Sequence, residues 1–296
     1  MAQKDNLTKD EHYIPKLYLR FFSPNENQIY QYRIGSRNLS KFVPIDSICY
    51  KKHLYELKND NNEFICRNMI EKALSDYEGV YDTIVKSIIS KSANESNYNI
   101  PCFLSTDEKR ILISFVATTI LRSPRSLELA KECALDLAIK DGKNMLENAA
   151  KNSAILTCVP FDNIFNHIYK SRNDTVLDEL SDSLMNMSFL IGVANGDKLY
   201  TSDNPVYWHG SSQTFDIDEV VFPLTSNLVL FLYPKKELPI GYRNKAIRLT
   251  DENVKGVNNR TIHCCREWVY SKKEINEAKI NIIEEIKGEP KCRTLT

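Results

Sequence analysis

Glycine is scarce in this sequence, at nine of 296 residues, and no stretch is rich in glycine and serine. A flexible linker between separately folding parts is therefore not indicated. The longest nearly apolar run, residues 111–121, is far shorter than the roughly 20 residues that cross a bilayer. The polar residues 1–11 contain no apolar segment of a signal peptide. We therefore expect a cytoplasmic protein without a membrane partner.

An excess of charge of either sign is also absent, because 39 lysine and arginine residues balance 39 aspartate and glutamate residues. Binding of nucleic acid therefore requires a local basic patch. The eight cysteines include no Cys-x-x-Cys pair, and without an export signal we expect them to be reduced thiols. Cys264 and Cys265 lie beside His263 but lack a second ligand pair for zinc, so no metal site is assigned.

Four motifs of common enzymes are missing. They are Gly-x-x-x-x-Gly-Lys-Ser/Thr, Gly-x-Gly-x-x-Gly, Gly-x-Ser-x-Gly and His-Glu-x-x-His. Their absence disfavours nucleotide hydrolases, dinucleotide oxidoreductases, esterases and zinc proteases of the usual kinds.

The composition that is present, 42% apolar and 26% charged residues, is typical of a packed globular protein. We expect one globular domain over residues 1–288 and a loose tail over 289–296. Its parts are an N-terminal mixed segment (1–62), a helical part (63–187) and a sheet followed by C-terminal helices (188–288). The predicted fold class is α+β, mostly helical, with one small antiparallel sheet built from the N-terminal strand and strands within 188–233.

Local patterns place the expected helices. Apolar residues spaced by three and four over residues 64–89 predict a long amphipathic helix. Ser105, three residues before Glu108, forms a capping box that begins a helix reaching about Arg122, where Pro124 breaks it. Further helices are expected over residues 125–150, 160–170, 174–187, 250–270 and 271–288.

Alternating or continuous apolar runs place the expected strands. Residues 28–34 alternate as a half-buried strand does. The Asn-Gly pair at 195–196 predicts a hairpin that joins 188–194 to 198–201. Residues 220–224 and 228–233 predict two further strands, and the second is apolar enough to be central. These strands are expected to form the small antiparallel sheet.

Several motifs carry a family resemblance. Residues 12–22 read His-Tyr-Ile-Pro-Lys-Leu-Tyr-Leu-Arg-Phe-Phe, and residues 201–206 read Thr-Ser-Asp-Asn-Pro-Val. Further matches in order are His-Leu-Tyr-Glu (53–56), Arg-Ser-Pro-Arg (122–125), Phe-Pro-Leu (222–224) and Asn258. With these motifs the chain resembles, over nearly its whole length, the bacterial family of unknown function numbered 4238. The resemblance implies no defined activity, and it suggests a link to mobile elements or phage defence.

The first motif contains His12, a candidate catalytic residue, because histidine titrates near neutral pH without perturbation. The alternative is that His12 only caps the first strand or helix. Tyr18 and Arg20 in the same motif are candidate substrate-binding residues, and they share one face if the segment is extended.

The motif at residues 201–206 places Ser202, Asp203 and Asn204 at the end of a strand, where binding and catalytic groups commonly lie. Asp203 is the second candidate catalytic residue, as a base, a metal ligand or a group that orients His12. Ser202 and Asn204 are candidate substrate contacts. The alternative is that these side chains cap their own turn. No cofactor follows from the sequence, although a divalent metal is compatible with Asp203.

Arg122 and Arg125 flank the expected helix break and form a candidate phosphate clamp, because guanidinium groups offer paired donors. The alternative is a buried salt bridge to Glu71 or Glu128. Asn258 is a weaker candidate for substrate binding, since asparagine on a helix face is often only solvated.

These residues favour an enzyme that acts on a phosphate-containing substrate, such as a nuclease-type hydrolase or a toxin-like effector, with nucleic acid or a nucleotide as partner. The alternative is a non-catalytic ligand-sensing or protein-interaction module, and the sequence leaves both classes open. The enzyme hypothesis is geometric: His12, Asp203 and an arginine must meet in one cleft.

Overall fold

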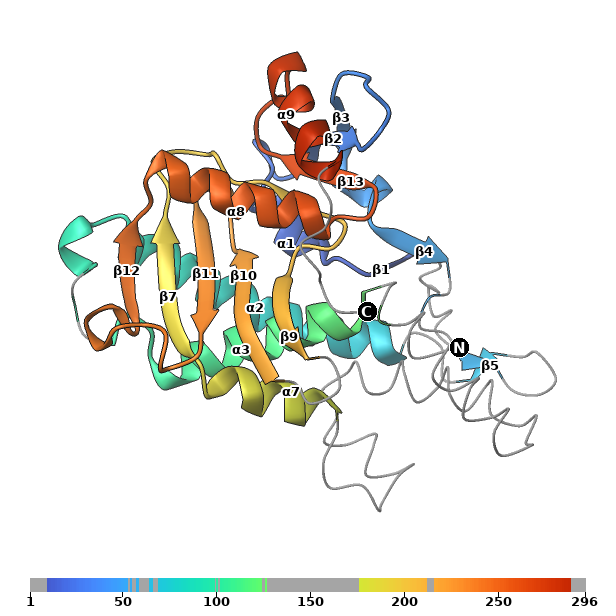
Figure 1. Cartoon of the computed structure of the whole chain (residues 1–296). Helices are drawn as coiled ribbons and strands as arrows, with labels where there is room; N and C mark the ends of the chain where they lie inside the picture. Colours follow the sequence, from blue (N-terminus) through green and yellow to red (C-terminus); the bar gives the residue numbers. More distant parts are fainter. Residues whose placement is uncertain are drawn as a thin grey trace.

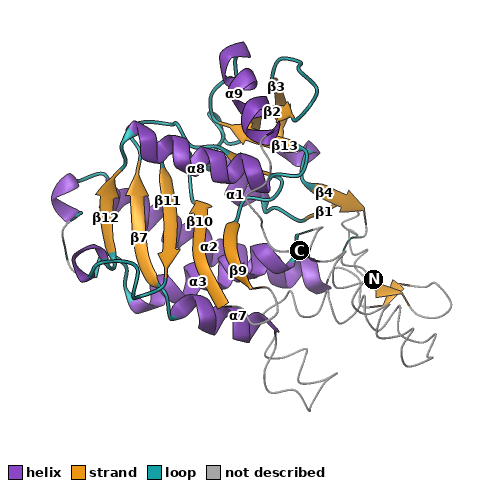
Figure 2. Ribbon diagram, in the orientation of Figure 1, coloured by secondary structure: helices purple, strands orange, loops and turns teal. Residues whose placement is uncertain are grey.

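The structure is a computed structural model, and it describes residues 10–126 and 176–288 apart from short gaps. The gaps are residues 53, 55–56, 59–63, 66–68, 99, 101, 124–125 and 212–215. A five-stranded sheet lies at the centre with helices on both of its faces, so the main body has three layers (Figures 1 and 2).

The central sheet has the strand order β12-β7-β11-β10-β9. Its strands are β7 (Ser188–Val193), β9 (Tyr207–Ser211), β10 (Asp216–Pro223), β11 (Leu228–Tyr233) and β12 (Lys245–Arg248). β11 pairs antiparallel with both β7 and β10, whereas β12 pairs with β7 in parallel. The sheet is therefore mixed.

A second sheet has the order β3-β2-β13-β8. Its strands are β2 (Gln28–Arg33), β3 (Lys41–Pro44), β8 (Thr201–Ser202) and β13 (Trp268–Ser271). Two short ribbons pair β1 (Asp10–His12) with β4 (Tyr50–Lys52), and β5 (Leu57–Lys58) with β6 (Phe64–Ile65). The second sheet joins the N-terminal segment to the C-terminal part of the chain.

The described helices are α1 (Lys16–Arg20), α2 (Met69–Ser92), α3 (Thr106–Leu121), α7 (Val176–Met185), α8 (Asp251–Cys264) and α9 (Glu277–Gly288). Short 3-10 turns occupy Ile45–Ser47, Glu95–Asn97 and Ile240–Tyr242. Figure 1 shows α8 across one face of the central sheet and α2, α3 and α7 on the other.

Alternate residues of β11 explain this layering, because successive side chains of a strand point to opposite faces. Leu228 and Leu230 pack in the cluster that holds the buried residues of α2 and α3. Val229 and Phe231 pack in a second cluster, which contains Val254 of α8. Both faces of β11 are therefore buried, as its continuous apolar sequence requires.

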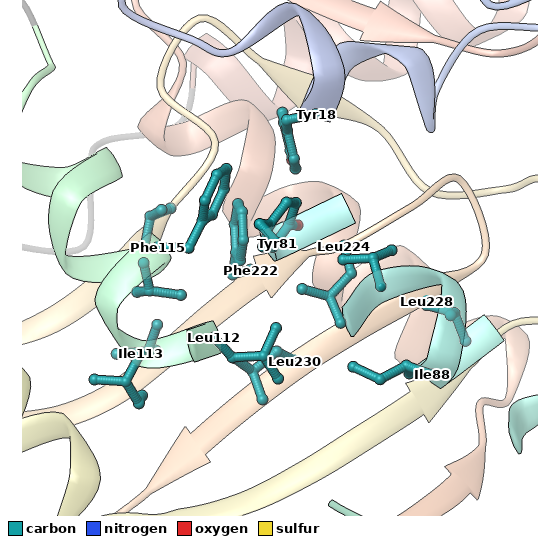
Figure 3. Packing of buried hydrophobic residues seen from close by; sticks show 14 of the residues in the cluster. Tyr18, Tyr81, Ile88, Leu112, Ile113, Phe115, Phe222, Leu224, Leu228 and Leu230 are labelled. Atoms are coloured by element: carbon teal, nitrogen blue, oxygen red, sulfur yellow. The ribbon is translucent and has the colours of Figure 1, made fainter. Parts of the chain in front are cut away.

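Four aromatic rings hold α1, α2, α3 and β10 together (Figure 3). Phe115 of α3 stacks on Tyr81 of α2 with ring centroids 3.5 Å apart. Phe222 of β10 lies 6.1 Å from Phe115 and stacks on Tyr18 of α1 at 5.2 Å. Because all four rings are buried, the short helix α1 is fixed against the main body.

The prediction of a mostly helical chain with one small antiparallel sheet is wrong. The described residues form a five-stranded sheet, a four-stranded sheet and two ribbons, and β2 is not in the same sheet as β7, β10 and β11. The helix expected over 250–270 ends at Cys264, and Trp268–Ser271 forms β13. Aromatic and β-branched residues in this stretch favour extended structure, which the helical spacing of the preceding residues concealed.

The expected hairpin after β7 is also wrong. The turn at Gly196 exists, with φ of 80°, but the amides of Lys198 and Leu199 donate to the carbonyl of Ser226 instead of pairing with β7. The neighbour of β7 is β11, along a register of six residue pairs. A turn signal marks a reversal of the chain, but the partner of a strand is selected by long-range packing.

Other predictions are confirmed: the strands at β2, β10 and β11, the helices at α2 and α7, and the capping box of α3. Two predicted helix starts are wrong, because Phe64–Ile65 forms β6 ahead of α2, and Ser271 belongs to β13 while α9 begins at Glu277. The helices expected over 125–150 and 160–170, and the tail 289–296, lie outside the described residues.

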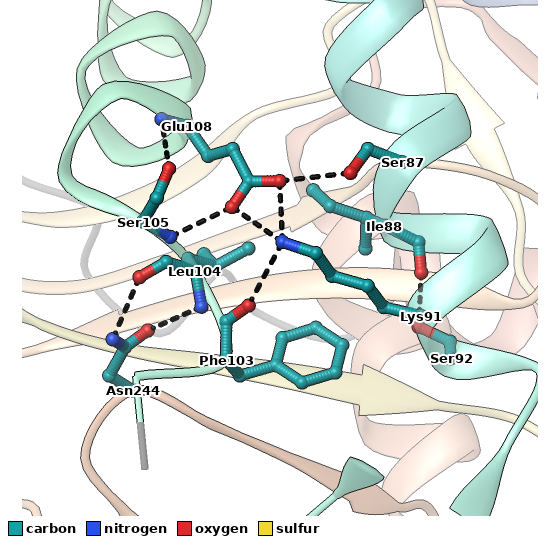
Figure 4. Close-up of polar contacts among 9 residues, drawn as sticks. All are labelled: Ser87, Ile88, Lys91, Ser92, Phe103, Leu104, Ser105, Glu108 and Asn244. Atoms are coloured by element: carbon teal, nitrogen blue, oxygen red, sulfur yellow. Dashed lines mark hydrogen bonds and ion pairs between the residues drawn. The ribbon is translucent and has the colours of Figure 1, made fainter. Parts of the chain in front are cut away.

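An ion pair ties α2 to the start of α3 (Figure 4). Lys91 Nζ lies 2.6 Å and 2.7 Å from the two carboxylate oxygens of Glu108. The amide of Ser105 donates to the same carboxylate at 2.8 Å, which completes the capping box. Asn244 bonds both the amide and the carbonyl of Leu104, so the segment before α3 is also held to the turn before β12.

The Lys91–Glu108 pair predicts an acid-sensitive contribution to stability. Burial raises the pKa of Glu108, but the hydrogen bonds from Lys91 and Ser105 outweigh it and leave the pKa below the usual 4.5. Because the folded pKa is depressed, the stabilisation is present above pH 4.5 and is lost as the pH falls through the folded pKa. Urea unfolding of Glu108→Gln should show a loss of about 1–2 kcal/mol at neutral pH that shrinks in acid. The exposed neighbour Asp107 serves as control, since Asp107→Asn should change little at either pH; an equal loss in both variants contradicts this account.

Candidate functional site

The helix α1 lies where three sequence motifs meet. The hydroxyl of Tyr18 donates to the carbonyl of Pro223 at 2.8 Å and lies 2.8 Å from Thr201 Oγ1. Burial raises the pKa of Tyr18 far above its usual value, so the hydroxyl stays neutral. Tyr18 therefore joins the first motif to the motif at 201–206 through hydrogen bonds in the interior.

A chain of charged side chains runs from α1 to the end of α3. Lys16 Nζ lies 3.0 Å from Asp46 Oδ1. Burial raises the pKa of Glu78 in α2, and the positive charge of Lys16 is among the smaller effects that oppose this rise. Glu78 Oε1 in turn lies 3.1 Å from Nη1 of Arg122. We call Lys16, Asp46, Glu78 and Arg122, together with His12, the α1 charge network.

His12 lies at the end of β1 and is 7% exposed, with its ring 5.6 Å from that of Tyr50 in β4. Burial and, next, the positive charge of Lys16 lower the pKa of His12, whereas Asp46 raises it to a smaller extent. The imidazole is therefore neutral near pH 7 and able to accept a proton. The pKa of Asp46 is lowered mainly by the hydrogen bond and charge of Lys16, and the exposed Arg20 adds a smaller effect of the same sign.

Arg122 is the most deeply buried charged group of this network, at 2% exposure. Nη1 is paired with Glu78, but within the described part of the chain Nε and Nη2 have no hydrogen-bond partner. Thr118, one turn earlier on α3, has a buried Oγ1 that likewise lacks a partner among the described residues. A buried hydrogen-bond donor without a partner costs about 1–3 kcal/mol, so an acceptor placed beside Arg122 would stabilise this site.

Glu78 pairs with Nη1 of Arg122 and, within the described ranges, leaves Nε and Nη2 without an acceptor. Burial raises its pKa, and this effect exceeds the opposing charge and hydrogen bond of Arg122. Arg125 and Glu128 lie outside the residues that the structure describes, as does the side chain of Glu71. Among the described residues, the salt-bridge partner of Arg122 is therefore Glu78, which is neither of the two partners considered from the sequence.

Asp203 is buried and binds backbone amides. Its Oδ1 accepts from the amide of Arg266 at 2.8 Å, and its Oδ2 accepts from the amide of Glu267 at 2.9 Å. Asn204 Nδ2 donates to the carbonyl of Cys264 at 3.0 Å, and Ser202 Oγ donates to the carbonyl of Asn204 at 2.8 Å. The motif at 201–206 therefore holds the turn between α8 and β13.

Burial raises the pKa of Asp203, and backbone hydrogen bonds and the charge of Arg266 offset this rise only in part. The negative charge of Asp203 raises the pKa values of Tyr13, Cys49 and Tyr270, in each case after the larger effect of burial. Cys49 Sγ donates to the hydroxyl of Tyr270 at 3.2 Å. Of the first motif, Tyr13 is the residue whose pKa responds to Asp203, whereas the pKa of His12 responds to Lys16 and Asp46.

Asn258 in α8 also binds backbone. Its Oδ1 accepts from the amide of Tyr200 at 2.9 Å, and its Nδ2 donates to the carbonyl of Lys198 at 2.9 Å. Both ends of this amide are occupied, so Asn258 fastens α8 to the segment before β8.

Three members of the network were missed by the sequence reasoning: Lys16, Asp46 and Glu78. A signal existed for Glu78, which lies four residues after Leu74 and three before Tyr81 on the apolar stripe of α2. A carboxylate on a buried stripe needs a partner. No comparable signal marks Asp46.

Two further findings concern metals and membranes. Within the described ranges, no group of three or more His, Cys, Asp or Glu side chains is placed so that it could hold a metal ion. No described helix is both long and apolar enough to cross a bilayer.

The fold and site define an α+β protein whose N-terminal motif is anchored by a short helix on a three-layer body. The chain belongs to the family described as protein of unknown function (DUF4238), whose model matches residues 11–274. This match confirms the resemblance and includes every residue of the α1 charge network. Comparisons with curated proteins and with solved structures find no match.

Proposed function

We propose that the protein is an enzyme acting on a phosphate-containing substrate at the α1 charge network. The observation that carries the proposal is the buried guanidinium of Arg122, which has two donors without partners in the described part of the chain. Phosphate oxygens accept paired hydrogen bonds from guanidinium groups. A phosphate group at this place would satisfy both donors.

His12 is the proposed general base, because its lowered pKa keeps the imidazole neutral at pH 7. In hydrolysis of a phosphate ester, it would take a proton from the attacking water, whose oxygen bonds to phosphorus as the ester P–O bond breaks. The leaving oxygen would take a proton from solvent, and Arg122 and Lys16 would stabilise the charge on phosphate. Arg20 contributes further positive charge on the exposed side. Asp203 acts as a positioning residue through the amides that it binds, and Tyr18, Ser202, Asn204 and Asn258 hold the surrounding segments. A nuclease or toxin-like effector, including one used in phage defence, is the form of this proposal to test first.

Expression of the protein and of two variants in cells tests the proposal. The unchanged protein should degrade cellular RNA or DNA and slow growth, whereas His12→Ala and Arg122→Gln should each reduce cleavage by about 100-fold or more. His209→Ala and Arg110→Gln are matched controls, because both residues are exposed and paired with a neighbouring carboxylate. Circular dichroism of the purified variants separates loss of folding from loss of activity. Intact nucleic acids and normal growth with the unchanged protein contradict a nuclease.

The pH profile gives a second readout of the same experiment. A general base with a lowered pKa stays active until it is protonated, so the acid limb of kcat/KM should lie below pH 6.5, the usual value for histidine. An acid limb at or above that pH contradicts the role of His12.

A second candidate is a non-catalytic ligand sensor, and the contacts of Tyr18 and Asp203 favour it. Their polar atoms bind other parts of the chain, as expected if the motif residues hold the N-terminal segment onto the fold. A sensor would bind inorganic phosphate or a nucleotide, measured by calorimetry, and release no product. Binding lost in Arg122→Gln without any cleavage by the unchanged protein would favour the sensor.

A further inference from the structure

A groove of about 190 Å³ lies between α8 and α9, away from the α1 charge network. In Figure 1, α9 lies beside α8, and α8 is on the face of the central sheet opposite α2 and α3. The apolar residues that line the groove include Val254, Ile262, Ile283 and Ile286. Ile282, also in the lining, is 49% exposed. Val254, Ile262, Ile283 and Ile286 are each at most 7% exposed, so Ile282 supplies the exposed apolar side chain of the groove.

The groove also has a polar group in need of a partner. Asn259 lines it, and the Oδ1 atom of Asn259 is buried without a hydrogen-bond partner among the described residues. Its neighbour Asn258, by contrast, uses both ends of its amide on backbone groups. A buried acceptor without a donor costs about 1–3 kcal/mol, and a ligand that donates to Asn259 would remove that cost.

The charges of the groove are positive in balance. Asp251 at one end is paired with Lys198, 2.7 Å away, so its charge is compensated. Lys255 of α8 and Lys279 of α9 also line the groove, and neither pairs with a carboxylate among the described residues. Lys279 Nζ donates to the backbone carbonyl of Glu274 at 3.2 Å. Two ammonium groups from two helices are thus available to an anion.

We propose that this α8–α9 groove binds a small amphipathic anion. The ligand has a ring of apolar character against Ile282, an N–H donor that reaches Asn259 Oδ1, and a carboxylate or phosphate group near Lys255 and Lys279. The groove volume of about 190 Å³ is small, which limits the ligand to one ring system. The proposal does not depend on the function proposed for the α1 charge network.

Indole-3-acetate is a suitable probe, since it has an aromatic ring, an N–H donor and a carboxylate. The purified full-length protein should bind it in saturation-transfer NMR or calorimetry. Naphthalene-1-acetate, which lacks the donor, and indole, which lacks the anion, should each bind about tenfold more weakly, equivalent to about 1.4 kcal/mol. Absence of binding at about 10 mM indole-3-acetate, or equal binding of all three probes, overturns the proposal.

Three variants locate the site. Asn259→Leu should weaken the binding of indole-3-acetate about tenfold and leave the binding of naphthalene-1-acetate unchanged. Lys255→Gln should weaken the binding of both anions by a similar factor. Ile282→Glu adds a negative charge at an already exposed position and should abolish binding without loss of folding. Lys236→Gln, at an exposed lysine of the turn after β11, is the control. Unchanged binding in Asn259→Leu and Ile282→Glu would show that the probe binds elsewhere, which contradicts the inference.

Because Arg122→Gln should leave this binding intact, failure here is distinct from failure of the proposed enzyme.

Discussion

The Arg122→Met variant should lose stability as the pH rises above 4.5, the usual pKa of glutamate, by about 3 kcal/mol more than the unchanged protein. Glu78 has a raised pKa even beside Arg122, because burial outweighs the ion pair. Without Arg122, that pKa rises further. A carboxyl group with a raised folded pKa favours the folded state while protonated, and this stability is lost as the pH rises through the folded pKa. Urea unfolding at a series of pH values measures the effect.

At the acid end of this series, the variant should match or exceed the stability of the unchanged protein. Methionine removes the two guanidinium donors that lack partners in the described part of the chain, and protonated Glu78 no longer needs a cation. The double variant with Glu78→Gln is the control, because it has no carboxyl group left at position 78 to titrate and should follow the pH dependence of the unchanged protein. A pH-independent loss in Arg122→Met would mean that packing, and not the charge of Glu78, determines the effect.

The Arg122–Glu78 pair shows how much of the site could be predicted from the sequence. Arg122 was predicted as an anion-binding or salt-bridged residue, because it lies at a helix break marked by Pro124. Its partner Glu78 is 44 residues earlier in the chain, and only the packing of α2 on α3 selects it over the other acidic residues. The expected meeting of His12 with Asp203 stays a prediction, and the described contacts direct attention to Lys16 and Asp46 instead.

For the fold, local sequence signals predicted where elements begin, but the sequence did not predict which strands pair with one another. The capping box of Ser105 and Glu108 involves residues three apart, so the sequence alone predicts it. By contrast, β13 pairs with β2 and β8, and these strands lie far apart along the chain. The four-stranded sheet therefore depends on contacts that no local pattern contains.

The aromatic cluster around α1 predicts the largest loss of stability from a single truncation. Phe115→Ala should lower the free energy of unfolding by about 4 kcal/mol, since Phe-to-Ala changes in cores cost about 3–5 kcal/mol. Phe115 is 2% exposed and stacks on Tyr81 at 3.5 Å, and its ring centroid lies 6.3 Å from that of Tyr18 and 6.1 Å from that of Phe222. Urea unfolding with an unchanged m-value is the measurement.

Phe42→Ala is the matched control, because Phe42 is 40% exposed on β3 and contacts the ring of Tyr30. Its loss should stay below about 1 kcal/mol. The cavity left by Phe115 lies next to Tyr18, so α1 should loosen and amide hydrogen exchange in α1 should quicken in Phe115→Ala but not in Phe42→Ala. A loss below about 2 kcal/mol, or protection of α1 that does not change, would show that α1 is held by the hydrogen bonds of Tyr18 to Thr201 and Pro223 without help from the ring cluster. In that case Tyr18→Phe, which removes only the hydroxyl, should loosen α1 by itself.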